Sequence, residues 1–360
     1  MFDRRTLATG LLAAAVAMSY AVVGGAQGQG AAAAPQAGAA AQGQGAGAPQ
    51  GQGRGAGGPA GGAQGRGAAG GGGGGRGAGR GAYTPPAGSK ELKDVLYNWT
   101  WHMGMLRSGA ESELIKTLDY HGASGTFQVN GQPCTASKIH AQWNYQIPGY
   151  RVQYECTLPN KQTVKNVENM SGDYAWDDDI PGAELVAGKG KSTPRQNTLT
   201  ERRIRLWASP HGAPKAAIAA AAGQPPSESF GENPAALLDR QAAAGVKGKT
   251  TLTWVTEKTV EKAVLTFPVP DVPGAMATAT LVNYLPESVV VTNGPDKYEF
   301  IYGKWADWNN PLFKIEALYP GTILERKNGA VVRNMTAKVT EIGQIYVIVP
   351  VPESIKKAGK

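Results

Sequence analysis

Hydrophobic residues recur at intervals of three or four in residues 90–107, a spacing that places them on one face of a helix. They are Leu92, Val95, Leu96, Trp99, Met103 and Leu106. A helix with one apolar face needs an apolar surface to cover. The segments that follow it predict a sheet that offers such a surface.

Two neighbouring segments alternate strictly between apolar and polar residues, as half-buried strands do. The apolar positions are Ile139, Ala141, Trp143 and Tyr145 in the first segment, and Tyr150, Val152, Tyr154, Cys156 and Leu158 in the second. The four residues 146–149 connect them, which predicts a hairpin with Tyr145 opposite Tyr150 and Cys156 opposite Ile139. Asn130-Gly131, a strong hairpin-turn signal, places a further strand before the pair.

The spacing of apolar residues changes twice more along the chain. Residues 195–245 are rich in Ala and Leu and predict a helical insertion, and from residue 248 eight short strand-like runs follow, the last being 344–350. With the first three strands this makes about eleven antiparallel strands. The fold class is therefore α+β, dominated by one antiparallel sheet.

The first 88 residues have a different composition. Residues 1–26 combine a charged start, an apolar stretch and the small residues Gly24 and Ala26, which predicts an export signal. Arg4-Arg5 suggests the twin-arginine route, but the surrounding motif is poor and favours Sec export; a retained anchor is the alternative. Residues 27–88 are rich in Gly, Ala, Gln and Arg and predict a disordered tether. The domain then spans 89–352, and 353–360 form a tail.

Charge is concentrated outside the predicted domain. Residues 1–82 hold six Arg and one Asp, so they contribute +5 of the net charge of +8. The domain is nearly balanced, which argues against a nucleic-acid partner. No segment after the export signal has about 18 uninterrupted apolar residues, so no membrane span is expected once the signal is cleaved.

Candidate chemistry is sparse. The four histidines are scattered without metal-ligand spacing, and His140 lies on the polar face of its strand, where a solvated histidine is expected. The acidic run Asp173–Asp179 offers several carboxylates, but it lacks the spacing of a calcium loop, and a charged turn is the preferred interpretation. A hydrolase that uses this cluster is the weakest alternative. We expect no catalytic residues, no metal and no cofactor.

The strand faces are rich in aromatic side chains that could line an apolar groove. We take them as candidate ligand-binding residues, with ordinary core packing as the alternative; they are Trp143, Tyr145, Tyr154, Trp254, Tyr284, Phe300 and Tyr302. The two cysteines, Cys134 and Cys156, could form a disulfide in an oxidising compartment. The expected register places Cys134 five residues beyond the pairing partner of Cys156, so a bridge requires residues 133–137 to bend back.

Two stretches resemble exported proteins of the LolA/LolB-like superfamily of outer-membrane lipoprotein carriers, and most closely its acidobacterial-type members. The first is YNWTWHMGMLR followed by LDYHGASGTFQVNGQ, and the second runs from LPESVVVTNG through EFIYGKWADW and YPGTI to the strand after KNG. The resemblance covers most of residues 89–352. It implies a half-barrel, a single curved sheet around one or more helices, that holds a lipid or lipoprotein acyl chain.

These observations predict an exported, non-enzymatic protein of the periplasm or outer-membrane surface that binds an apolar ligand in a half-barrel groove. A lipid or lipoprotein acyl chain is the expected partner, with an envelope protein as a further partner. The alternative is a structural or protein-interaction module whose groove is filled by its own helix.

Overall fold

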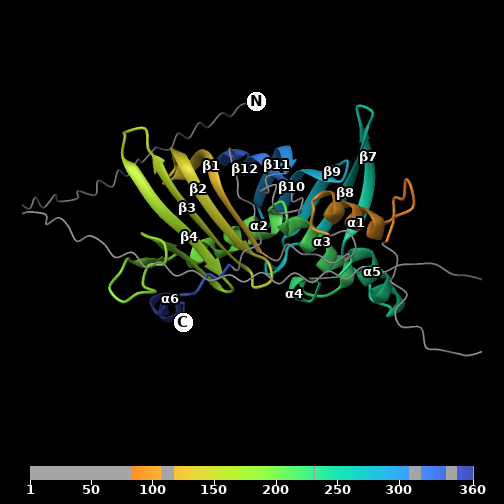
Figure 1. The fold of residues 1–360 in the computed structure, drawn as a ribbon, viewed down its shortest axis with the longest axis horizontal. Coiled ribbons are helices and arrows are strands. Elements are labelled where there is room, and N and C mark those ends of the chain that lie inside the picture. The colour runs from red at the N-terminus through yellow and green to blue at the C-terminus, as the bar shows by residue number, and fades with distance from the viewer. Residues whose placement is uncertain (1–82, 107–116, 230–231, 308–317, 338–346, 360) are drawn as a thin grey trace, which may run out of the picture. The chain divides into compact units, whose positions relative to one another are not determined.

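In a computed structural model, the described residues form one curved sheet of thirteen antiparallel strands, which is not closed (Figure 1). The structure describes residues 83–106, 117–229, 232–307, 318–337 and 347–359, all of which belong to the unit Gly74–Lys360. The strands are Thr117–Val129 (β1), Gln132–Asn144 (β2), Gly149–Thr157 (β3), Thr163–Ser171 (β4), Tyr174–Asp178 (β5), Ser192–Pro194 (β6), Thr251–Glu257 (β7), Val260–Pro268 (β8), Met276–Val282 (β9), Leu285–Asn293 (β10), Asp296–Asp307 (β11), Leu318–Lys327 (β12) and Ala330–Ala337 (β13).

The order of the strands shows how the chain builds the sheet. It is β6-β5-β4-β3-β2-β1-β13-β12-β11-β10-β9-β8-β7. From β1 the chain therefore adds strands outward to one edge, β6, then crosses to the opposite edge, β7, and returns inward to β13. The central pair, β1 and β13, joins segments about two hundred residues apart, with Ala123 opposite Ala337.

The crossing between the two edges is made by the helical segment. Its helices are Leu199–Ala208 (α2), Gly212–Ala222 (α3), Pro226–Ser229 (α4) and Pro234–Ala243 (α5); Leu92–His102 (α1) and Glu353–Ala358 (α6) lie elsewhere in the chain. In Figure 1, α2 and α3 lie between the two wings of the sheet, and they contact β4, β5, β8 and β10. All residues of α3 except Ala220 are buried. The segment predicted as a helical insertion therefore packs on the concave face.

The periodicities of the sequence correspond to the buried faces. On β2 the side chains of Ile139, Ala141 and Trp143 are buried, and on β3 those of Tyr150, Val152 and Tyr154 are buried. The helical face predicted for residues 90–107 is confirmed in α1, where Val95 and Trp99 are fully buried. The turn at Asn130-Gly131 is also confirmed, and both residues have positive φ, 51° and 75°, as the tightest hairpin turns require.

The strand count of about eleven was too low. Strands β4, β5 and β6 fall in a polar stretch without a clear alternation, because β4 and β5 carry charged and amide side chains on both faces. The last predicted strand, 344–350, is not confirmed: residues 347–350 are irregular, and the remainder lies outside the described residues.

The predicted register of the β2–β3 hairpin was wrong by two residues. Trp143, not Tyr145, lies opposite Tyr150, and Asn144 pairs with Gly149, so the connection is 145–148. An irregularity between Ala136 and Lys138 adds a further shift, which places Cys156 opposite Ala136 rather than Ile139.

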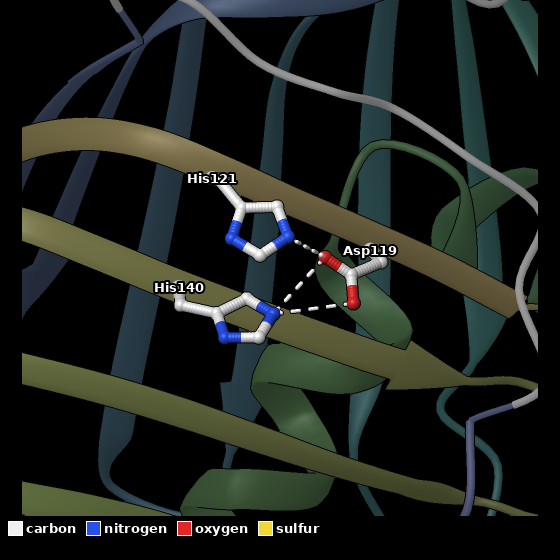
Figure 2. A group of neighbouring side chains, drawn as sticks. All are labelled: Asp119, His121 and His140. Carbon is white, nitrogen blue, oxygen red and sulfur yellow. Dashed lines mark hydrogen bonds and ion pairs between the residues drawn. The ribbon is translucent and has the colours of Figure 1, made fainter. Parts of the chain in front are cut away.

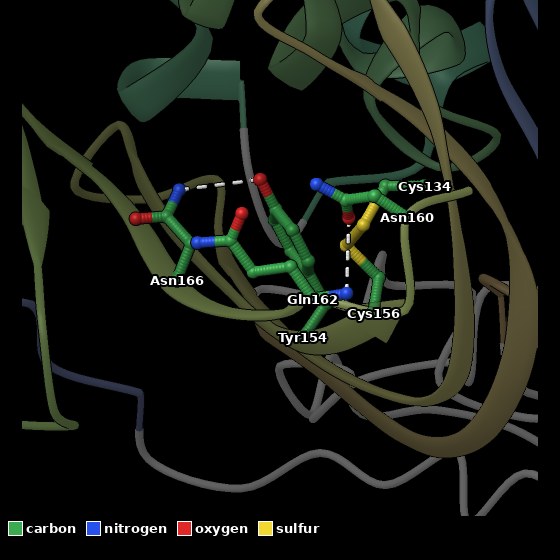
Figure 3. Close-up of a disulfide and its surroundings, with 6 residues drawn as sticks. All are labelled: Cys134, Tyr154, Cys156, Asn160, Gln162 and Asn166. Atoms are coloured by element: carbon green, nitrogen blue, oxygen red, sulfur yellow. Dashed lines mark hydrogen bonds between the residues drawn. A yellow bond between two sulfur atoms is a disulfide. The ribbon is translucent and has the colours of Figure 1, made fainter. Parts of the chain in front are cut away.

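The corrected register brings the two cysteines together. Cys134 and Cys156 form a disulfide with their Cα atoms 5.4 Å apart (Figure 3). Cys134 lies two residues, not five, beyond the partner of Cys156 on β2. The 5.4 Å separation lies within the span of a disulfide, and the irregularity between Ala136 and Lys138 lies at the end of the segment 133–137 that was expected to bend.

The predicted export signal, 1–26, and nearly all of the predicted tether lie outside the described residues. Residues 83–88, the end of that predicted tether, are described, and Tyr83 lies against α1: its ring contacts Tyr97 edge-on at 5.0 Å, and its hydroxyl donates a hydrogen bond to Asp94. Among the described residues, none of the helices has the length and apolar character that a bilayer crossing requires.

Candidate functional site

The aromatic residues predicted to line a groove lie mainly in the hydrophobic core. Five of the seven are buried, namely Trp143, Tyr145, Tyr154, Phe300 and Tyr302. Trp254 and Tyr284 are partly buried. Two of the buried aromatic side chains contact residues at the end of α2. The Tyr145 hydroxyl lies 3.1 Å from the Ser209 hydroxyl, and Tyr302 donates a hydrogen bond to the Ala208 carbonyl.

A small cavity remains between α2 and the sheet. Its volume is about 30 Å³, and Trp143, Phe300 and Tyr302 contribute to its lining. An engineered apolar cavity that holds a benzene molecule is about 150 Å³. In the described conformation the cavity is therefore far smaller than a long acyl chain.

Charged side chains also line this cavity. The Arg205 Nε of α2 lies 2.8 Å from Glu325 Oε1 of β12, and Arg333 Nε of β13 lies 3.6 Å from Glu325 Oε2. Arg333 also forms an ion pair with Glu168 of β4. Burial alone would raise the pKa of Glu168, but the positive charges of Arg333, Arg205 and Arg202 outweigh it and hold this pKa at about 2. The interior thus contains a paired ionic network.

The acidic run predicted as a weak hydrolase candidate is used in separate contacts. Asp177 forms ion pairs with Arg195 and Arg202. The Asp178 carboxylate is buried and accepts a hydrogen bond from the Ser192 hydroxyl at 2.6 Å. Burial raises the pKa of Asp178 despite the opposing effect of this bond and of Arg151.

The two ends of the acidic run are bound elsewhere. Asp173 pairs with Arg203, and Asp179 accepts a hydrogen bond from the Lys191 backbone N–H at 2.7 Å. The structure therefore does not bring these carboxylates together as a catalytic pair facing one cleft.

A different group of side chains does converge, on the face of the sheet opposite the helices. Asp119 and His121 alternate with the core residues Leu118 and Tyr120 on β1, and His140 alternates with core residues on β2. Figure 2 shows both imidazole rings directed at the Asp119 carboxylate, with the helices behind the strands. We call Asp119, His121 and His140 the outer-face triad.

The distances within the outer-face triad are those of direct hydrogen bonds or ion pairs. His121 Nε2 lies 2.8 Å from Asp119 Oδ1, and His140 Nε2 lies 3.0 Å from Oδ1 and 3.1 Å from Oδ2. The two imidazole rings are stacked, with their centroids 3.9 Å apart. Gln142 Nε2 donates a hydrogen bond to Asp119 Oδ2 at 2.9 Å.

The three side chains differ in exposure. The side chain of Asp119 is 6% exposed, that of His140 28% and that of His121 49%. Burial would raise the pKa of Asp119, but the hydrogen bonds from His140 and Gln142 outweigh this effect and lower it. The carboxylate is therefore held as an anion beneath two imidazoles that solvent can reach.

The sequence analysis missed this grouping. It placed His140 correctly on the polar face of its strand, but His121 and His140 are far apart in sequence and show no ligand motif. The signal lay in the pairing of β1 with β2, where Asp119 faces Gln142. Counting back from the Asn130-Gly131 turn, with Val129 opposite Gln132, already places Asp119 opposite Gln142. The two register shifts on either side of Ala123 cancel, so the structure keeps this pairing.

The chain matches no protein-family model and none of the curated proteins. The function must therefore be inferred from the geometry of the sheet, its helices and its side-chain clusters.

Proposed function

We propose that the described domain is a non-enzymatic interaction module whose concave face is filled by its own helices. The observation that carries this proposal is that α2 and α3 pack against the concave face and leave a cavity of only about 30 Å³ between α2 and the sheet, among the residues that the structure describes. Helix α3 is buried along nearly its whole length beneath the sheet, a position that a groove-bound ligand would otherwise occupy. Binding would then use the outer surface of the sheet, its edges and its loops.

The edge strand β7 is a surface that suits this role. None of its seven residues is buried, and the side chain of Val255 is 45% exposed. An exposed edge strand offers unpaired backbone groups to which a partner strand can add. We further propose that the protein is exported and that residues 27–82 act as a flexible tether that presents the domain to a partner in the cell envelope.

Binding of an apolar ligand is the second candidate, as the half-barrel resemblance implies. The observation that favours it is that Trp143, Phe300 and Tyr302, three of the predicted groove residues, line the cavity between α2 and the sheet. Each buried methylene contributes about 0.8 kcal/mol, so a long chain could be held without charged contacts. The helices would first have to move away from the sheet.

Native purification followed by lipid extraction and mass spectrometry distinguishes the two. The interaction module predicts no stoichiometric lipid and little fluorescence from an apolar-pocket dye such as anilinonaphthalene sulfonate. Phe300→Ala enlarges the cavity and should increase dye uptake, at a cost of about 3–5 kcal/mol in the free energy of unfolding.

Phe267→Ala is the matched control, because Phe267 is fully buried but does not line this cavity. Equal dye uptake by both variants would mean general loosening rather than a specific cavity. One equivalent of lipid on the natively purified protein would contradict the interaction module and support the apolar-ligand function.

A further inference from the structure

Four features of the outer-face triad point to a role beyond that of an interaction module: its donor atoms, its geometry, its accessibility and its position on the sheet. Two imidazole nitrogens and one carboxylate oxygen lie within 4.8 Å of one another. Of the four histidines in the chain, two meet at this single point. We propose that Asp119, His121 and His140 form a Zn²⁺-binding site on the outer face of the sheet.

The geometry is close to what a zinc ion requires. Zn²⁺ binds imidazole nitrogen and carboxylate oxygen at about 2.0–2.2 Å in a tetrahedral arrangement, which separates neighbouring ligand atoms by about 3.3 Å. Asp119 Oδ1 now lies 2.8 Å from His121 Nε2 and 3.0 Å from His140 Nε2. Both separations are a few tenths of an ångström below the tetrahedral value, so binding requires this widening and a turn of the imidazole rings from the carboxylate toward the ion.

The donor set selects the class of metal. Calcium and magnesium prefer sites made of oxygen ligands, whereas imidazole nitrogens suit zinc, copper and nickel. Three protein ligands leave one position of a tetrahedral zinc ion for water or another donor. The negative charge of Asp119 partly neutralises the dication.

Local structure holds the carboxylate in place and leaves the histidines reachable. Gln142 binds Asp119 Oδ2 at 2.9 Å and leaves Oδ1 directed at the imidazoles. Hydrogen bonds of this kind to a ligating carboxylate orient metal ligands in proteins. The His121 side chain is 49% exposed, so an ion can enter from solvent.

A bulge in the sheet lies at the outer-face triad. Tyr120 pairs with Ala141 and Ala123 pairs with Ile139, so two residues of β1, His121 among them, oppose His140 alone. Bulges of this type redirect side chains and are common beside functional sites. A zinc ion bound here would cross-link β1 and β2.

The test uses the full chain without a histidine tag, stripped of metal by a chelator and titrated with ZnCl₂ by calorimetry. We expect saturable binding of one Zn²⁺ per chain and a thermal midpoint that rises with Zn²⁺ concentration. The double variant His121→Gln/His140→Gln should bind at least about 100-fold more weakly, because it retains one of three ligands. Gln142→Ala keeps all three ligands and should weaken binding by about 10–100-fold.

The control variant is His102→Gln. His102 is an exposed histidine on α1, and its Nδ1 lies 2.8 Å from the Asn98 carbonyl oxygen, away from the outer-face triad. It should bind Zn²⁺ like the parent chain. Should a variant fail to fold, bound Co²⁺ in the parent chain provides an independent measurement, because its visible absorption reports nitrogen and oxygen ligands in a tetrahedral site. Failure of the parent to bind, or equal binding by the double variant, would overturn the proposal and leave the triad as a hydrogen-bonded group.

Discussion

His211 illustrates how burial controls a single side chain in this domain. It lies immediately before α3, is fully buried and stacks on Tyr319 with the ring centroids 6.0 Å apart. Burial, with a smaller contribution from the positive charge of Lys215, lowers the pKa of His211 to about 3. Contact with the Met103 backbone has a smaller, opposite effect. The imidazole is therefore neutral in the folded protein at neutral pH.

This shift predicts a pH-dependent loss of stability. In the unfolded chain a histidine has a pKa of about 6.5, so as the pH falls the unfolded chain takes up a proton before the folded one. The contribution of His211 to the free energy of unfolding is therefore complete above pH 6.5. It is lost between about pH 6.5 and about pH 3, by up to about 1.4 kcal/mol per pH unit. Urea unfolding at several pH values should show a smaller decline for His211→Gln than for the parent chain. If the free energy of unfolding of both proteins declined equally with falling pH, the lowered pKa of His211 would be contradicted.

At the scale of elements, the pairing of β1 with β13 closes the sheet in its middle. Gly125 of β1 lies at this pairing, opposite Met335. A Cβ added there would overlap the backbone oxygen of Asn334, and a backbone atom in a paired strand cannot move aside cheaply. The lack of a side chain at residue 125 therefore permits close approach of the two halves of the sheet.

Gly125→Ala should accordingly lower the free energy of unfolding by about 1–3 kcal/mol. The matched variant is Gly303→Ala, in β11, where the added Cβ would lie 2.9 Å from the Thr322 hydroxyl, the end of a side chain that can rotate. It should cost less than about 1 kcal/mol. Chemical unfolding measures the free energy of unfolding of both variants. Equal losses would show that the close approach of β1 and β13 does not require glycine at residue 125.

At the scale of the whole molecule, α2 connects strands that are far apart in the sheet. Arg202 donates hydrogen bonds to the carbonyl oxygens of Asn169 in β4 and Trp176 in β5, both at 2.7 Å. Arg205 reaches Glu325 of β12, on the other side of the central pair. The buried arginines of α2 thus contact strands in both wings of the sheet.

Arg205→Met should cost about 3–5 kcal/mol, because it leaves buried Glu325 with a single, more distant cationic partner. The double variant Arg205→Met/Glu325→Leu should regain much of this loss, since it removes both buried charges. Arg203→Met is the control: Arg203 pairs with exposed Asp173, and its loss should cost less than about 1 kcal/mol. Thermal and urea unfolding of the parent chain and the three variants measures these costs. A double variant no more stable than Arg205→Met would contradict this role of the Arg205–Glu325 pair.

Much of the architecture followed from local patterns. The alternation of apolar residues predicted β2, β3 and seven strands after residue 248, because each strand buries one face, and the 3–4 spacing predicted α1. Strands β4 to β6 escaped prediction because their polar side chains have partners that approach only after folding: Asp177 pairs with Arg202 of α2, and Asp178 accepts a hydrogen bond from Ser192 of β6.

The sequence by itself determined the α+β class, the antiparallel sheet and the identity of most buried faces, since these depend on the period of apolar residues along a short segment. Only the tertiary structure decided the pairing of Cys134 with Cys156, the packing of α2 and α3 on the concave face and the meeting of Asp119, His121 and His140. The cysteine pairing depends on register, because the shift between Ala136 and Lys138 changes which side chains face each other without changing the local pattern. The helix packing and the meeting of the three side chains depend on contacts between segments that are separate in sequence, which no local period encodes.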